Sequence, residues 1–270
     1  MNSESWDVGY PKGLIKYIDI FREKYFQYEV FDTVLKNYID KHINVNGRRI
    51  CSLGSGTGRH EVELAKLGYE VIGLERNEES IEIASQYVKD SNVDVKLLKC
   101  DFLIQEELDA VMMEIGCVDI VALLLIPISQ ADYATAVNNM GKWIKQGGIF
   151  VTDNFGYAEE IDSKSLILAS TVEVANATNG VDYAVRMNYY EYQNNIVNWD
   201  AVYLYHDEDN KLCMKRDHDI LDVVPEESGV DALELDQNIF KILPTYRIVE
   251  CQDCINPPYL YEYLVGWEKI

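Results

Sequence analysis

The stretch ICSLGSGTGR, residues 50–59, joins a short apolar run to a turn that contains three glycines. Glycines in such a turn let the backbone bend sharply and allow a ligand to approach it closely. In open α/β folds, the turn after the first strand lies at the carboxyl edge of the sheet, where cofactors bind. The stretch therefore predicts an α/β domain with a ligand site at this turn.

The residues around the turn continue the α/β pattern as far as about residue 155. Short apolar segments, which predict strands, alternate with segments whose apolar residues recur every three or four positions, which predict helices. The expected strands span 49–53, 69–74, 93–98, 118–126 and 149–153. The expected helices span 59–67, a segment capped by Asn77, and 129–144. Such an alternation indicates a parallel sheet covered on both faces.

The regions on either side have different patterns. Residues 12–43 have an amphipathic helical period and predict one or two helices. After Asp153 the apolar and polar residues alternate, with turn signals between the segments 165–175, 181–192, 196–206 and 211–222. We therefore expect an antiparallel sheet inserted after the fifth strand. The remaining expected elements are a helix near 230–242 and two final strands at 247–251 and 261–267.

These patterns predict how the chain is divided. The expected parts are a helical cap (1–45), an α/β core (46–156), an inserted antiparallel β lid (157–224) and C-terminal elements that complete the core sheet (225–270).

Composition excludes several classes of partner. The chain has 270 residues, 48% of them hydrophobic, and a formal net charge of −22, so it should fold as a packed globule that repels nucleic acid and anionic membranes. Residues 1–150 contain 16 basic and 23 acidic residues, whereas residues 151–270 contain 8 and 23. The longest apolar run, 120–128, is far shorter than the roughly 20 residues of a membrane span. We expect a cytoplasmic protein that binds a small molecule.

The spacing of the glycines narrows the kind of ligand. A dinucleotide-binding loop would need a glycine where Arg59 stands, and a nucleotide P-loop would need Lys after Gly58. Glu75 ends the second expected strand, where a carboxylate can accept hydrogen bonds from a ribose diol. Asp101 follows the third expected strand and should lie at the same edge of the sheet.

The glycine turn, Glu75 and Asp101 follow or end successive expected strands. With this arrangement, the chain resembles the class I S-adenosylmethionine-dependent methyltransferases over residues 10–155. The resemblance implies a Rossmann-like, doubly wound sheet of seven strands, with S-adenosylmethionine as the cofactor. It also implies a set of cofactor-binding residues. These are Gly54, Ser55, Gly56 and Gly58 around the methionine part, Glu75 at the ribose with Arg76 beside it, Asp101 and Phe102 at the adenine, and Leu124 on the sulfonium side.

The resemblance has one departure and leaves two alternatives open. The family usually has an acidic residue where Ser52 stands, so the network that orients the cofactor's amino group must be supplied differently. A non-catalytic S-adenosylmethionine-binding regulatory protein is therefore one alternative. The other is an aminopropyltransferase-like enzyme, although the loop of that family contains an Asp where this chain has Thr57.

The acceptor is expected to be a small polar molecule. The architecture of the insert resembles glycine and amino-sugar N-methyltransferases, and its acidic and aromatic side chains favour a cationic acceptor. We therefore expect N-methylation rather than O-methylation. An amine that has already lost its proton needs no strong base. If the chain supplies a base, the candidates are Asp153, Asn154, Tyr157 and His218.

Other motifs favour structural interpretations. The tetrapeptide Asn256-Pro-Pro-Tyr259 matches an amine-holding motif, but it lies near the end of the chain and reads as a proline turn. Cys251 and Cys254 have a metal-like spacing without a second pair, so no metal is expected. His206 is expected at the surface of the insert. The sequence leaves open whether the chain is a monomer or a homodimer.

Overall fold

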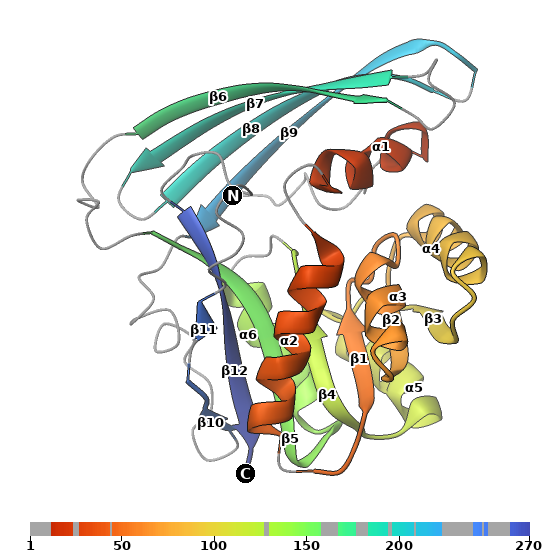
Figure 1. Ribbon diagram of the computed structural model, residues 1–270, viewed down its shortest axis with the longest axis vertical. Coiled ribbons are helices and arrows are strands. Elements are labelled where there is room, and N and C mark those ends of the chain that lie inside the picture. The colour runs from red at the N-terminus through yellow and green to blue at the C-terminus, as the bar shows by residue number, and fades with distance from the viewer. Residues whose placement is uncertain are drawn as a thin grey trace. The chain divides into compact units, whose positions relative to one another are not determined.

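The computed structural model describes residues 12–23, 27–43, 45–126, 130–157, 167–176, 183–193, 196–207, 209–222, 240–244, 246–247 and 260–270. These residues form two compact units. The core unit contains the predicted α/β elements, and the insert unit contains the first helix and the inserted strands (Figure 1).

The core unit is a mixed sheet whose central strands are parallel. Seven strands lie in the order β10-β12-β5-β4-β1-β2-β3, and β11 pairs with β12. Their bounds are Arg49–Leu53 for β1, Glu70–Glu75 for β2, Val95–Lys99 for β3, Val118–Leu123 for β4, Ile144–Tyr157 for β5, Phe240–Ile242 for β10, Tyr246–Arg247 for β11 and Leu260–Lys269 for β12. The strand order reverses between β1 and β4, which pair in parallel. Ligands of open α/β sheets bind at such a reversal.

Helices cover both faces of this sheet, with α2 in front of it and α6 behind it in Figure 1. The helices of the core unit are α2 (Tyr28–His42), α3 (Arg59–Lys66), α4 (Glu78–Asp90), α5 (Gln105–Ile115) and α6 (Gln130–Gly141). Asn77 caps α4 as predicted, because its side chain accepts a hydrogen bond from the backbone nitrogen of Ser80 at 3.1 Å. The predicted Rossmann-like sheet of seven strands is confirmed.

The structure differs from the sequence prediction in three elements. Helix α5 was not expected, although Leu108, Met112 and Ile115 are buried at helical spacing. Strand β5 begins at Ile144 rather than at residue 149, and its register against β4 shifts between Ile144 and Ile149. A Cβ atom at Gly148 would lie 2.5 Å from the carbonyl oxygen of Asp119, so this close approach requires glycine.

The third difference concerns the C-terminal part. Residues 240–242 were expected to end a helix, but they form β10, whose partners are Trp267 and its neighbours on β12. Pairing with a strand supplies the backbone hydrogen bonds that a helix would otherwise satisfy internally. The earlier part of that expected helix and residues 248–251 lie outside the described residues.

The insert unit is a four-stranded antiparallel sheet in the order β6-β7-β8-β9, as predicted. Its strands span Ile167–Asn176, Tyr183–Gln193, Ile196–His206 and Leu212–Asp222. Helix α1 (Lys12–Glu23) packs Leu14, Tyr17 and Phe21 against alanines and tyrosines on one face of this sheet. The two N-terminal helices, expected to form one cap, therefore belong to different units. None of the helices that the structure describes is sufficiently long and apolar to span a bilayer.

Candidate functional site

The glycine turn after β1 is held by the neighbouring strand. The backbone nitrogens of Gly54 and Ser55 both donate to the carbonyl oxygen of Leu74, at 2.7 and 2.9 Å. Gly54, Gly56 and Gly58 have φ angles of 69°, 53° and 80°, in the left-handed region that favours glycine. Gly58 is also the N-cap of α3. The residues that connect β1 to α3 therefore form a rigid turn, called here the glycine loop (Gly54–Gly58).

Two positions of the glycine loop differ in the space around them. A Cβ atom at Gly54 would overlap Cδ1 of Ile126, which follows β4. A Cβ atom at Gly56 would meet nothing within 4 Å. The loop is thus packed against the end of β4 on one side and leaves open space over Gly56, where a ligand can approach the backbone.

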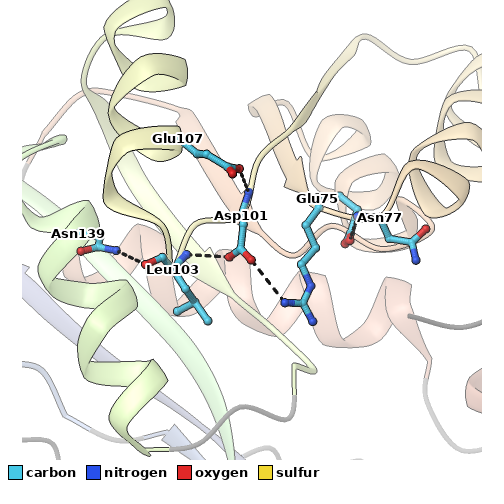
Figure 2. A network of polar contacts seen from close by, with 7 residues as sticks. Glu75, Asn77, Asp101, Leu103, Glu107 and Asn139 are labelled. Carbon is cyan, nitrogen blue, oxygen red and sulfur yellow. Dashed lines mark hydrogen bonds and ion pairs between the residues drawn. The ribbon is translucent and has the colours of Figure 1, made fainter. Parts of the chain in front are cut away.

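Glu75 at the end of β2 is oriented by two backbone groups. Its Oε2 accepts a hydrogen bond from the nitrogen of Gly56 at 2.9 Å. Its Oε1 accepts one from the nitrogen of Asn77 at 2.8 Å (Figure 2). An ionised carboxylate has about four lone-pair positions, so this one can accept further hydrogen bonds from a ligand. The predicted acid and the predicted glycine loop are in direct contact.

Asp101 organises the loop that follows β3. Its Oδ1 accepts a hydrogen bond from the nitrogen of Leu103 at 3.0 Å, and its Oδ2 lies 3.4 Å from Nη1 of Arg76 (Figure 2). The nitrogen of Asp101 donates to Oε2 of Glu107 at 3.1 Å. Asn139 donates to the carbonyl oxygen of Leu103 at 3.2 Å. This loop is therefore anchored from α5 and α6 as well as from Arg76.

Phe102 lies close to the glycine loop. Its Cε1 would be 3.7 Å from a Cβ atom at Gly54, and the side chain is buried. The ring thus links the loop after β3 to the loop after β1. The structure brings together the sequence-predicted residues that follow three parallel strands.

The end of β4 is held by β5. Leu124 is buried, and Leu125 adopts a left-handed φ of 53°. The nitrogen of Leu125 donates to Oδ1 of the buried Asp153 at 2.8 Å. Asp153 therefore fixes an unusual backbone conformation beside the glycine loop. A non-glycine residue in this conformation costs roughly 1–2 kcal/mol.

The remaining candidate bases lie on β5 and on the insert unit. Asn154 and Tyr157 belong to β5, but their side chains lie outside the described residues. His218 lies on β9 in the insert unit, with Nδ1 3.3 Å from Oδ1 of Asp200 and half of its side chain exposed. His206 ends β8 and meets the ring of Tyr183 edge-on at 6.1 Å.

Sequence reasoning missed a buried polar group behind the glycine loop. Nδ1 of His60 lies 2.8 Å from Oδ1 of Asp32, and the rings of Tyr28 and Phe31 meet the imidazole edge-on at 4.9 and 5.3 Å. The next residue, Glu61, is also buried. The available signal was two adjacent ionisable residues in the first turn of a helix that begins at the loop.

Burial and mutual contact shift the pKa values of this group. The carboxylate of Asp32 raises the pKa of His60, although burial of the imidazole opposes the shift. Burial raises the pKa of Glu61 to about 7, against the lowering effects of the Ser52 hydrogen bond and of His60. Burial thus favours the neutral form of Glu61, and the Asp32 carboxylate favours the protonated form of His60.

Comparison with known families identifies the chain. Residues 44–203 match the family described as methyltransferase domain. The chain belongs to this methyltransferase family. Comparison of the methyltransferase with the sequences of curated proteins finds no significant match. Its cofactor is S-adenosylmethionine, in agreement with the interpretation of the glycine loop.

Solved structures share the fold of this methyltransferase at low identity. A sugar N-methyltransferase from Streptoalloteichus sp. is 15% identical, with a TM-score of 0.64, and the match covers 92% of this chain and 91% of that one. An amino pentose methyltransferase from Micromonospora echinaspora is 15% identical, with a TM-score of 0.59 and coverage of 92% and 95%. An S-adenosylmethionine-dependent methyltransferase from Clostridium acetobutylicum is 13% identical, with a TM-score of 0.63 and coverage of 92% and 94%.

The residues of the methyltransferase fit its cofactor. The open space over Gly56 leaves the backbone accessible, and the fixed carboxylate of Glu75 beside it suits a ribose diol. The described part of the chain contains no group of His, Cys, Asp or Glu side chains arranged to hold a metal ion. Cys251, Cys254 and the tetrapeptide 256–259 lie outside the described residues.

Proposed function

We propose that this methyltransferase transfers the methyl group of S-adenosylmethionine to an amine of a small polar acceptor. The assignment of S-adenosylmethionine as the methyl donor rests on the contact between Gly56 and Glu75, at the reversal of the strand order. In this proposal, Gly54, Ser55, Gly56 and Gly58 hold the methionine part, as the resemblance implies.

The other cofactor residues would act at the neighbouring strand ends. Glu75 would accept hydrogen bonds from the ribose hydroxyls, while Arg76 and Asp101, which face each other at 3.4 Å, would border the adenine. Phe102 would cover the adenine with an apolar ring, and Leu124 would lie on the sulfonium side. Each role requires only a group that the structure already holds in place.

The chemistry of methyl transfer is supplied by the sulfonium of the bound cofactor. The protein must hold the two reactants in line and exclude water. Correct positioning of the reactants can by itself lower the barrier to methyl transfer. Asp153 contributes by fixing the backbone of Leu125, so we assign it as a positioning residue rather than as a base. An amine that has lost its proton before binding needs no base in the site.

The acceptor surface is proposed to lie on the insert unit, on the sheet face that also carries α1. Tyr190 and Trp199 stack there, with ring centroids 6.1 Å apart and an interplanar angle of 9°. Nε1 of Trp199 donates to Asn188, which in turn donates to Glu173 at 3.0 Å. Aromatic faces attract a protonated or alkylated amine. The carboxylate of Glu173 is buried and paired with Arg186, so the attraction is assigned to the two stacked rings.

Two further observations support an amine acceptor. Residues 151–270 contain 23 acidic and only 8 basic residues. Two of the structural neighbours are named as a sugar N-methyltransferase and an amino pentose methyltransferase. The electrostatic field of the insert would therefore favour a cationic molecule over an anionic one.

A paired set of acceptors tests this proposal. Purified protein is incubated with methyl-labelled S-adenosylmethionine and with sugars and amino acids that differ only in carrying an amine, a hydroxyl or an added carboxylate. Transfer to amines at a rate well above that to the matched hydroxyl compounds is expected. Preferred transfer to the hydroxyl or carboxylate members would contradict it, and tight cofactor binding without transfer to any acceptor would favour a regulatory protein.

A pair of variants tests the acceptor surface. Trp199→Leu should raise the KM for the amine about tenfold, the equivalent of one stacking contact, while leaving the Kd of the cofactor unchanged. Tyr189→Leu is the matched control, because Tyr189 is exposed on the opposite face of the same sheet. Equal effects of the two substitutions would rule out the proposed surface.

A further inference from the structure

The antiparallel sheet of the insert unit has two faces of different character. Helix α1 covers one of them with Leu14, Tyr17 and Phe21. The opposite face, called here the outer face, is made of the alternate residues of β6 to β9 whose side chains point away from α1. Eight of the twelve exposed large hydrophobic side chains among the described residues lie on the outer face, so exposed apolar surface is concentrated there. Six of them are Val172, Val174, Tyr183, Met187, Leu212 and Met214.

The apolar side chains of the outer face are contiguous. One cross-strand row extends over all four strands and is entirely apolar; its members are Val174, Val185, Leu204 and Met214. The neighbouring row continues the apolar surface on β6, β7 and β8 with Val172, Met187 and Val202. Val172 and Met214, at opposite edges of the sheet, are both 72% exposed. Monomeric proteins rarely expose a contiguous apolar patch of this kind, which is typical of a surface that another molecule covers.

The charged side chains beside these apolar rows compensate one another. Nη2 of Arg216 lies 2.8 Å from Oδ1 of Asp200, and Nδ1 of His218 lies 3.3 Å from the same oxygen. Residues 151–270 as a whole contain 23 acidic and only 8 basic residues, so two copies of the chain repel each other over much of this region. The apolar rows and the paired charges of the outer face offer a contact without that repulsion. A nucleic acid or an anionic membrane would still meet the surrounding carboxylates.

The size of the outer face suits a contact between two copies. Strands lie about 4.8 Å apart and rise about 3.4 Å per residue, so four strands of 10 or 11 residues present a face of roughly 600 Å². Two such faces in contact would bury about 1,200 Å² in total, which reaches the range of stable, specific interfaces. A two-fold axis brings the same patch of each copy together, so a second copy supplies both a sheet of matching size and matching apolar rows.

We propose that the outer face is a homodimer interface, on which a second copy of this chain packs sheet against sheet about a two-fold axis. Sheets packed in this way lie about 10 Å apart and interdigitate their apolar side chains. The inference is independent of the cofactor and of the proposed acceptor. The stacked rings of Tyr190 and Trp199 lie on the opposite face of the sheet, so this contact does not cover the proposed acceptor surface.

Sedimentation equilibrium of the full chain over a wide range of concentrations tests self-association, and we expect a particle of twice the mass of one chain. Met214→Glu should weaken the dimer at least about a hundredfold, because the two-fold axis introduces the buried charge twice. Met113→Glu is the matched control, since Met113 on α5 is 74% exposed but lies in the core unit, and it should leave the dimer intact. A monomeric original protein, or equal effects of the two substitutions, would overturn the proposal.

Oxidation of methionine locates the contact in the original protein, without a variant whose folding must be checked. The protein is treated briefly with hydrogen peroxide at concentrations below and above the dissociation constant of the dimer, and the sulfoxide at each methionine is measured by mass spectrometry. Oxidation of Met214 should become slower as the dimer forms, whereas that of the equally exposed Met113 should not change. A dimer in which Met214 is oxidised as fast as in the dilute protein would place the contact on another surface and contradict the proposal.

Discussion

The carboxylate of Glu75 accepts a hydrogen bond from the backbone nitrogen of Gly56 at 2.9 Å, so the end of β2 orients the turn that follows β1. The two residues lie 19 positions apart in the sequence. Parallel strands make this contact possible because their carboxyl ends meet at one edge of the sheet. In the proposed site, donor binding would depend on that edge remaining in register.

Glu75→Ala should weaken S-adenosylmethionine binding by about 1–3 kcal/mol, since it removes an acceptor and leaves the nitrogen of Gly56 without its partner. Calorimetric titration measures the change. Glu78→Ala is the matched control, because Glu78 lies three residues away and is exposed beside Lys99. An unchanged Kd in Glu75→Ala would remove Glu75 from the site.

Gly56→Ala should lower both stability and cofactor affinity. The φ of 53° makes a side chain there cost about 1–2 kcal/mol, and the new methyl group would occupy the open space over the loop. Gly68→Ala provides the comparison, because Gly68 has a φ of 93° and equally open surroundings at the end of α3. Both variants should lose similar unfolding free energy in urea titrations, and only Gly56→Ala should lose affinity.

Asp153→Ala should destabilise the protein by about 1–3 kcal/mol, because the part-buried nitrogen of Leu125 would lose its acceptor. Asp153→Asn keeps an acceptor oxygen and should retain most of the stability. If Asp153 acts by positioning, kcat in Asp153→Asn should stay within about tenfold of the original value. Loss of kcat by more than a hundredfold with normal stability would instead identify Asp153 as a base.

Asp32→Asn should reduce the dependence of stability on pH. The pKa of His60 is raised in the folded protein, so its stabilising contribution is complete below its unfolded pKa near 6.5 and is lost as pH rises through the folded value. At pH 6 the free energy of unfolding of the original protein should therefore be higher than that of Asp32→Asn by about 1–3 kcal/mol.

Urea denaturation of the original protein and of Asp32→Asn at pH 6, 7, 8 and 9 measures this difference. The stability difference between the two proteins should shrink as pH increases. A constant difference across this range would show that the imidazole does not change its charge there.

The sequence was sufficient for the features that depend on local patterns and on spacing. Glycine at positions 54, 56 and 58, the cap at Asn77 and the acids that end or follow the strands could be predicted because each depends on a few neighbouring residues. The alternating segments of the insert predicted its four strands for the same reason. Once the strands are parallel, the sheet itself brings the predicted residues to one edge.

Tertiary packing determined the remaining features. His60 pairs with Asp32 from 28 residues away, and Glu61 is buried in the first turn of α3, neither of which leaves a periodic signal. Residues 240–242 form a strand only because β12 offers them backbone partners. The local pattern along the chain thus places the glycine loop and its carboxylate, whereas contacts between distant segments set the protonation of the groups behind it, because burial and charge proximity exist only in the folded protein.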